Sequence, residues 1–250
     1  MDLDATLRGA PFAAPVRADA AIARGLAPHR GDLSLPVLTL DDGAFRANRD
    51  LFFRYLAAHG AVVAPHAKTP MSPAIVAELR EAGAWGASVA NLQQAAVLMQ
   101  AGEPRLLLAN EIGGQASGRR LGALLAHYPA TELYAFADSP QAVAALAAAA
   151  QAGGRGPLPV LVEVGAGRAG ARDEAAVDAV IAAILAQGRW VRLAGVATYE
   201  GAVAGPDDVA TKAAINTLMA RTIEAFMRVR AASPDAPLLI SAGGSAYFDL

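Results

Sequence analysis

Lysine is rare in this chain of 250 residues, and its positions limit any chemistry that needs an amine. Of the 21 basic residues only Lys68 and Lys212 are lysines, and all the others are arginines. Arginine stays protonated in proteins, whereas a lysine can lose its proton and act as a nucleophile. If the protein performs amine chemistry, these two residues are the candidates. Cysteine is absent, which excludes a thiol nucleophile, a thiolate metal site and a disulfide framework.

A second feature with chemical potential is the run Gly243-Gly244-Ser245, which follows Ser241. Glycines let backbone N–H groups approach an anion closely, and a helix N-terminus behind them adds a favourable dipole. Taken alone, however, Gly-Gly-Ser is an ordinary loop sequence. The interpretation of this run therefore depends on where the fold places it.

The elements that must position these residues alternate along the chain. Short apolar runs with strand character occur at 61–65, 84–89, 105–109, 132–137, 159–164, 191–198 and 237–241. Stretches with helical spacing occur between them at 71–82, 91–101, 116–127, 140–152, 174–187 and 209–231. A further strand is expected at 37–40, followed by a helix at 44–58 that Asp41 or Asp42 caps. Wholly apolar strands separated by helices predict a parallel sheet covered on both faces.

This alternation predicts an α/β fold, a TIM-type (β/α)8 barrel. The sequence stops at Leu250, about where the seventh helix would begin, so the barrel is expected to be truncated before strand 8. A parallel barrel that lacks one strand leaves two unpaired edges. We expect residues 1–35 to form an irregular N-terminal arm and residues 36–250 to form the barrel domain. The alternative is an open doubly wound sheet, which tolerates seven strands.

In such barrels the active site lies at the carboxyl ends of the strands. Lys68 follows the first predicted strand, whereas Lys212 falls within a predicted helix, where a solvated surface lysine is expected. The loops after strands 7 and 8 are the usual phosphate site, which favours the anion-binding interpretation of the glycine run. An amine and a phosphate-binding turn at one rim together predict pyridoxal phosphate, with Arg168 lowering the pKa of the amine. The alternative for Lys68 is a rim lysine in a surface ion pair.

Here the sequence resembles a known family. The run Pro65-His66-Ala67-Lys68-Thr69 resembles the Pro-His-x-Lys-Thr signature of the D-serine dehydratase/D-threonine aldolase family. These are fold-type III pyridoxal-phosphate enzymes, related to alanine racemase in their N-terminal barrel. Further blocks match in the same order, namely Gly83-Ala84-Trp85-Gly86, Leu107-Leu108-Ala109-Asn110, Glu163-Val164-Gly165, Arg168-Ala169-Gly170, Tyr199-Glu200-Gly201 and residues 241–249. They are most similar to the amino-acid deaminase, or D-serine deaminase-like, subgroup.

The resemblance implies a role for each matching residue. Lys68 would hold the cofactor as a Schiff base, Arg168 would donate to its phenolic oxygen, and Tyr199 would lie near its pyridine nitrogen. The phosphate-binding residues it implies are Ser241, Gly243, Gly244 and Ser245. His66 lies two residues before the lysine, so it would either contact the cofactor or orient its neighbours.

The resemblance also implies a lyase acting on D-3-hydroxy amino acids, either as a dehydratase or as an aldolase. A divalent metal assists such relatives, and its ligands normally come from a C-terminal β domain that this chain lacks. Many relatives continue the lysine motif as Thr-His-Lys, whereas this chain has Thr69-Pro70-Met71. Two alternatives stay open, a non-catalytic pyridoxal-phosphate carrier and an amino-acid racemase. Because the barrel would be unclosed, these 250 residues alone are expected to bind the cofactor weakly or not at all.

The composition of the chain excludes some classes of binding partner. The net charge of −2 and the pI near 6.1 argue against a nucleic-acid partner, which usually meets a basic face. No apolar run reaches membrane-spanning length, and the N-terminus lacks the apolar core of a signal peptide. We therefore expect a cytoplasmic protein with a small-molecule substrate and no membrane partner. The resemblance further implies a homodimer in the full-length protein.

Overall fold

A computed structural model describes residues 2–244 and 246–247. The chain divides into two compact units, residues 1–55 and residues 56–250, and each is described by itself. Ser245, which the sequence places in the phosphate-binding turn, lies outside the described residues. None of the helices within these ranges combines the length and apolar character that crossing a membrane requires.

The first unit contains short elements and the start of a long helix. Strand β1 (Asp2–Leu3) pairs antiparallel with β2 (Val16–Arg17), and helix α1 (Ala18–Ala23) and the 3-10 helix η1 (Pro28–Arg30) follow. Residues 1–35 are therefore not irregular throughout. The strand expected at 37–40 is wrong, because this apolar run pairs with no other strand and leaves Leu38 95% exposed.

The helix expected at 44–58 is confirmed as α2 (Asp42–Ala58). Its predicted cap is Asp41, whose side-chain oxygen accepts a hydrogen bond from the N–H of Ala44 at 2.8 Å. Such a side-chain acceptor satisfies one of the N–H groups that the first turn of a helix leaves free. The last residues of α2 belong to the second unit.

The second unit is built on one parallel sheet of six strands in the order β3-β4-β5-β6-β7-β8. The strands are β3 (Ala87–Val89), β4 (Arg105–Leu108), β5 (Glu132–Ala137), β6 (Leu158–Val164), β7 (Val191–Thr198) and β8 (Leu239–Ala242). The helices of this unit are α3 (Pro73–Glu81), α4 (Leu92–Gln100), α5 (Gly114–His127), α6 (Pro140–Ala152), α7 (Glu174–Ala186) and α8 (Asp208–Ala232). A 3-10 helix, η2 (Glu200–Val203), follows β7.

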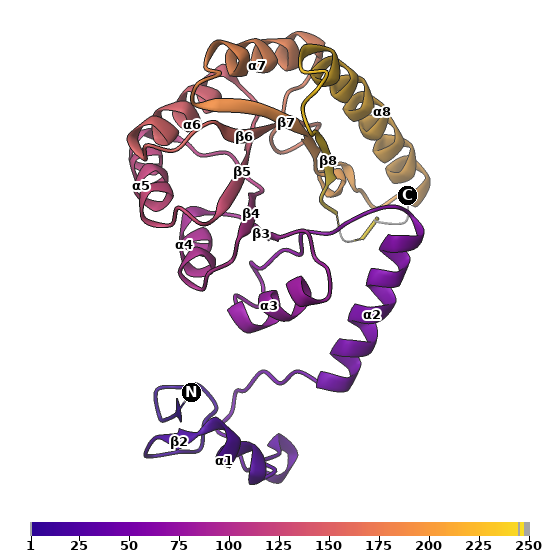
Figure 1. The fold of residues 1–250 in the computed structure, drawn as a ribbon. Helices are drawn as coiled ribbons and strands as arrows, with labels where there is room; N and C mark the ends of the chain where they lie inside the picture. Colours follow the sequence, from indigo (N-terminus) through magenta and orange to yellow (C-terminus); the bar gives the residue numbers. More distant parts are fainter. Residues whose placement is uncertain (1, 245, 248–250) are drawn as a thin grey trace. The chain divides into compact units, whose positions relative to one another are not determined.

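The strand order rules out the doubly wound alternative. In a doubly wound sheet the order reverses at a switch point, whereas here every strand lies next to its sequence neighbour. The helices α4 to α8 follow one another along the outer side of the curled sheet (Figure 1). Strands wound in one direction with helices on one side are the architecture of a (β/α) barrel, and the sheet forms a curled half-barrel.

The strand predicted at 61–65 is also wrong, because this segment forms no regular strand. It nevertheless runs beside β3 and is bonded to it, since the N–H of Trp85 donates to the carbonyl of Val63 at 2.8 Å and that of Ser88 to Pro65 at 2.9 Å. An isolated parallel bridge joins His66 to Ser88. The segment thus occupies the position of a first barrel strand, with too few bonds to be one.

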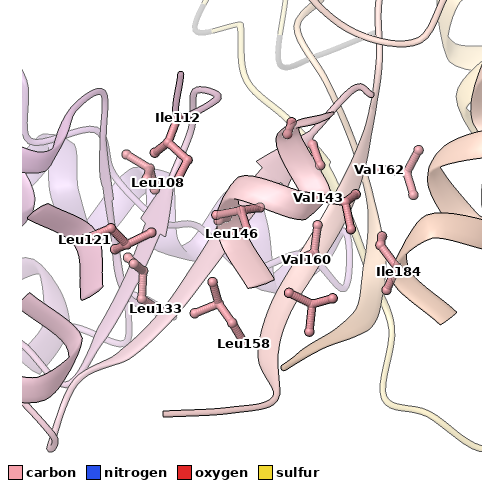
Figure 2. Packing of buried hydrophobic residues seen from close by; sticks show 14 of the residues in the cluster. Leu108, Ile112, Leu121, Leu133, Val143, Leu146, Leu158, Val160, Val162 and Ile184 are labelled. Carbon is pink, nitrogen blue, oxygen red and sulfur yellow. The ribbon is translucent and has the colours of Figure 1, made fainter. Parts of the chain in front are cut away.

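Two apolar clusters pack the two faces of the sheet. The larger joins the outer face to the helices, and Figure 2 shows its side chains, among them Leu146 of α6 and Val160 of β6. The smaller lines the inner face and contains Leu107, Phe136, Leu161, Ala194 and Ala197. Both alanines of β7 reach the inner face because the register with β6 shifts between Val160 and Leu161.

Candidate active site

The candidate residues lie along one edge of the sheet, with Lys68 at one end of it and the glycine turn at the other. All six strands are parallel, so their carboxyl ends lie at the same edge, where barrel enzymes carry their chemistry. Three groups of residues lie there. The first follows the segment at 61–66, the second follows β7 and β8, and the third follows β6. Each group is described in turn, beginning with the lysine.

Lys68 lies in a tight turn that follows the bridge to β3. The N–H of Ala67 donates to the carbonyl of Ser88 at 2.8 Å, and the N–H of Met71 closes the turn on the carbonyl of Ala67 at 2.9 Å. Met71 has a φ of 39°, a left-handed conformation that is uncommon for a residue with a side chain. Ala67 is buried and anchors the turn, whereas the Lys68 side chain is exposed and free to reach a ligand. Lys212 is also exposed, but it lies on helix α8, as predicted.

His66 orients this turn. Its Nδ1 accepts a hydrogen bond from the backbone N–H of Lys68 at 3.3 Å. Burial lowers the pKa of His66, the charge of Lys68 lowers it further, and a hydrogen bond with the backbone of Ser88 opposes both effects. A neutral imidazole can accept through Nδ1, so the lowered pKa and the hydrogen bond agree. The contact agrees with the orienting role, and a contact between His66 and the cofactor stays a prediction.

The second group joins the ends of β7 and β8. Glu200 is buried, and its Oε2 accepts a hydrogen bond from the N–H of Gly243 at 3.2 Å. A Cβ on Gly244 would lie 2.2 Å from Glu200 Oε1, so any larger residue would force the buried Glu200 side chain to move. A Cβ on Gly243 would lie 3.6 Å from the ring of Tyr199. The Gly243 N–H is thus occupied by Glu200, and a phosphate bound at this turn would have to take the place of that side chain.

Ser241 enters this group from β8. It pairs in register with Ala197, two residues before Tyr199 on β7, and its side chain is half-buried. Ser241 therefore lies two residues before Gly243 at the end of β8, beside the end of β7 that leads to Tyr199. Tyr199 is 42% exposed, so its ring is accessible from solvent.

The third group is the loop at 165–172, which follows β6 and carries Arg168. The N–H of Gly165 donates to the carbonyl of Ala171 at 3.1 Å, and the N–H of Ala171 donates back to Glu163 at 2.7 Å. A Cβ on Gly165 would lie 1.5 Å from the carbonyl oxygen of Ala169, so the loop folds on itself more closely than any side chain would allow. Arg168 is exposed on this loop.

Beneath the loop lies a set of carboxyl groups that the sequence analysis missed. One of them, Glu163, lies near the end of β6, and the other two, Glu111 and Asp138, follow β4 and β5. Asp138 accepts a hydrogen bond from the N–H of Gly170 at 3.2 Å. Burial raises the pKa of Glu163 to about 9; the hydrogen bond to Glu111 and the charges of Glu111 and Asp138 act in the same direction, and Arg168 opposes them. Glu163 is therefore neutral at pH 7. Its Oε2 and Glu111 Oε1 are buried without a hydrogen-bond partner among the described residues.

A signal for these acids was present in the sequence. Residues two apart on a strand share a face, and Glu111 continues the inner-face series that begins with Leu107. Asp138 follows Phe136 in the same way, and Glu163 follows Leu161. Extending the period-2 alternation beyond each apolar run would therefore have placed three carboxyl groups on the inner face.

No metal site accompanies these groups in the described part of the chain. Among residues 2–244 and 246–247, no three His, Cys, Asp or Glu side chains gather in a way that could hold a metal ion. Of these carboxyl groups, Asp138 is bonded to the N–H of Gly170, and burial favours the protonated form of Glu163.

Comparison with known proteins assigns this arrangement to a family. Residues 40–248 match the family described as alanine racemase, N-terminal domain. The chain belongs to this family. Its match includes the second unit's sheet, the lysine turn and the glycine turn.

Relatives of the chain include lyases. It is 29% identical over 220 residues to a curated D-threonine aldolase from an Arthrobacter species, an alignment that covers 86% of this chain and 56% of that protein. The solved D-threonine aldolase from Filomicrobium marinum superposes with a TM-score of 0.74 at 26% identity, over 87% of this chain and 58% of the other. The chain thus spans less than two thirds of the length of these relatives.

More distant structures share the fold. D-threo-3-hydroxyaspartate dehydratase from Delftia sp. HT23 gives a TM-score of 0.63 at 24% identity, over 82% of this chain and 60% of the other. Alanine racemase from Bacillus anthracis gives 0.62 at 16% identity, over 80% of this chain and 49% of the other. At these identities the comparison supports the barrel fold of the alanine racemase N-terminal kind.

Proposed function

We propose that this chain is the cofactor-binding barrel of a pyridoxal-phosphate lyase that acts on D-3-hydroxy amino acids. The observation that carries the proposal is that an exposed lysine, a glycine turn bonded to a carboxylate and an arginine loop lie at the same edge of one parallel sheet. The names of the two aldolase relatives support the reaction class.

The residues of the edge fit the parts of the cofactor. Lys68 would supply the amine for covalent attachment, and Gly244, together with Gly243 once its N–H leaves Glu200, would supply N–H groups for the phosphate. Ser241 lies just before this turn, and the sequence adds Ser245 to it. Arg168 would donate to the phenolic oxygen and Tyr199 would face the pyridine nitrogen. When bound, pyridoxal phosphate withdraws electrons from the Cα of an attached amino acid, and the protein selects the bond that breaks.

Two residues of the chain, His66 and Tyr199, would have separate roles in the reaction. His66 holds the backbone of Lys68, which keeps the amine at the rim. Tyr199 is a phenol and not a carboxylate, so it does not enforce a protonated pyridine nitrogen. A weaker electron sink favours reactions in which the electrons on Cα leave at once through a neighbouring bond. That requirement suits both an aldolase and a dehydratase.

The domain limits and the partners complete the proposal. We propose that the barrel domain begins near residue 36 and that the substrate is a small D-amino acid. A divalent metal that polarises the substrate hydroxyl would take its ligands from outside this chain. Location in the cytoplasm and assembly as a homodimer stay predictions from the sequence.

Product analysis of the full-length protein tests the reaction class. With pyridoxal phosphate and a divalent cation, an aldolase converts D-threonine to glycine and acetaldehyde, and a dehydratase converts D-serine to pyruvate and ammonia. Either pair of products supports the proposal. Binding of pyridoxal phosphate without either pair would replace it with the carrier function, and interconversion of D- and L-alanine would replace it with a racemase.

A further inference from the structure

An arginine of helix α8 makes hydrogen bonds to the loop that carries Arg168. Arg221 projects from α8 and donates to three main-chain carbonyls of the loop. Its Nη2 lies 2.5 Å from the carbonyl oxygen of Arg172 and 3.4 Å from that of Ala171, and its Nη1 lies 3.5 Å from that of Gly165. The three acceptors come from the two ends of the loop, so one guanidinium joins the place where the loop leaves the sheet to the place where it ends.

Guanidinium geometry explains why an arginine occupies this position. Its planar fork presents several N–H donors in fixed directions, and donors that carry charge make stronger hydrogen bonds than neutral ones. A lysine ammonium has three donors on one atom and cannot span two ends of a loop in the same way. Arg221 is also half-buried, so water competes less for its donors than at the surface.

The loop has no apolar core of its own to fix it. Gly165, Gly167 and Gly170 occupy three of its eight positions, and Gly170 has a φ of 93°. Glycine loses more conformational freedom on folding than any other residue, so a loop this rich in glycine needs outside contacts to stay in one conformation. The bonds described above hold its two ends, and buried Ala171 anchors its last turn in the larger apolar cluster. Its middle has only the side-chain bond from Arg172 Nη2 to the carbonyl of Gly167 at 3.2 Å, among the bonds of the described residues.

The loop also faces the neighbouring part of the candidate site. A Cβ on Gly167 would lie 2.7 Å from the carbonyl oxygen of Ala202, which belongs to η2. That 3-10 helix begins at Glu200, directly after Tyr199. The conformation of the loop thus determines where Arg168 lies relative to the group formed by Tyr199 and the glycine turn.

We infer that Arg221 is a positioning residue that holds the loop at 165–172 in the conformation that presents Arg168 to the cofactor. The inference deepens the proposed function, because it takes Arg168 as the residue that contacts the cofactor. Among the described residues, the hydrogen bonds of Arg221 all go to main-chain carbonyls, so it acts through the loop.

Amide hydrogen exchange in the full-length protein without added cofactor tests the first half of the inference. Arg221→Gln should speed exchange in peptides that cover residues 163–173 by about tenfold, because the loop loses three charge-assisted contacts. The matched control is Arg228→Gln on the same helix, which removes surface ion pairs to Glu174 and Asp178 and should leave these peptides unchanged. Equal exchange in the wild type and in Arg221→Gln would overturn the inference.

Titration with pyridoxal phosphate, followed by visible absorption, tests the second half. Arg221→Gln should weaken binding by about tenfold, Arg168→Ala by at least as much, and the double variant no more than Arg168→Ala alone. Additive losses would mean that Arg221 supports the fold and not Arg168, and would overturn the inference. Arg221→Lys should fall between the wild type and the glutamine variant, and it serves as the second variant if glutamine prevents folding.

The two measurements separate this inference from the proposed function. If the wild-type protein bound no pyridoxal phosphate, the proposed function would fail and the positioning role would fail with it. The exchange result would still decide whether Arg221 holds the loop. If the wild type bound the cofactor and Arg221→Gln bound it equally well, the inference alone would fail.

Discussion

The middle of the sheet and its two ends differ in how they are stabilised. Every residue of β6 is buried, whereas β8 alternates between half-buried and exposed residues, and Ile240 is 54% exposed. At the other end, the segment at 61–66 makes isolated bonds to β3 and leaves Val62 69% exposed.

This difference separates stability from chemistry. The apolar centre supplies the free energy of folding, while Lys68 and the glycine turn are attached to the two ends. Ligand-binding segments commonly come from the less stable parts of a protein, because they need room to move. Substitutions in the centre should therefore change the free energy of unfolding, and substitutions at the ends should change cofactor binding.

The largest effect on stability is expected in the centre. Leu161→Ala should lower the free energy of unfolding by about 2–5 kcal/mol, because Leu161 is fully buried and the truncation leaves a cavity. Ile240→Ala in β8 should lower it by less than about 1 kcal/mol, since half of that side chain is already in water. Urea unfolding measures both. Equal losses would show that the ends of the sheet are as tightly packed as its centre.

A smaller effect is expected at the glycine turn. Gly244→Ala should lower the free energy of unfolding by about 1–3 kcal/mol and weaken pyridoxal-phosphate binding at least as much, because its Cβ would collide with the Glu200 carboxylate. Gly113→Ala is the control, since a Cβ there meets nothing within 4 Å. The unfolding free energy and the absorption titration report the two quantities. A Gly244→Ala variant that matches the control in both would remove the turn from the site.

A further effect concerns pH. Glu163 has a pKa of about 9 in the folded chain, above its ordinary value of 4.5, so unfolding releases a proton between these two pH values. The free energy of unfolding should therefore fall as the pH rises from 4.5 to 9, by at most about 1.4 kcal/mol per pH unit from this group.

Glu163→Gln cannot ionise, so this contribution to the slope should vanish in urea unfolding measured from pH 5 to pH 9. Glu224→Gln, which replaces an exposed carboxyl group on α8, should keep the slope of the wild type. Parallel curves for the wild type and Glu163→Gln would show that the acid is ionised in the folded chain.

Most of the fold could be predicted from the sequence because its signals are local. The wholly apolar strands β6 and β7 and the helices between strands follow from periodicity and helix caps. The apolar runs at 37–40 and 61–65 failed as strands because an apolar run indicates burial and not the presence of a pairing partner. Register with a neighbour is a property of the assembled sheet.

The candidate site was predictable only in part. Lys68 stood out by type and the glycine run by its place after a strand, and whether they hold the cofactor stays a prediction. Arg221 could not be found in this way, because its partners are carbonyl groups about fifty residues away in the chain. A carbonyl group has no sequence signature, so only the folded chain shows which loop an arginine holds.

The central claim is that Lys68 is the residue that binds pyridoxal phosphate, and the chain has only two lysines with which to test it. The full-length protein, incubated with pyridoxal phosphate and reduced with borohydride, should yield a peptide that carries the pyridoxyl group on Lys68. Lys212 should stay unmodified, and Lys68→Ala should abolish the label and the visible absorption. A label on Lys212, or on neither lysine of this chain, would contradict the account.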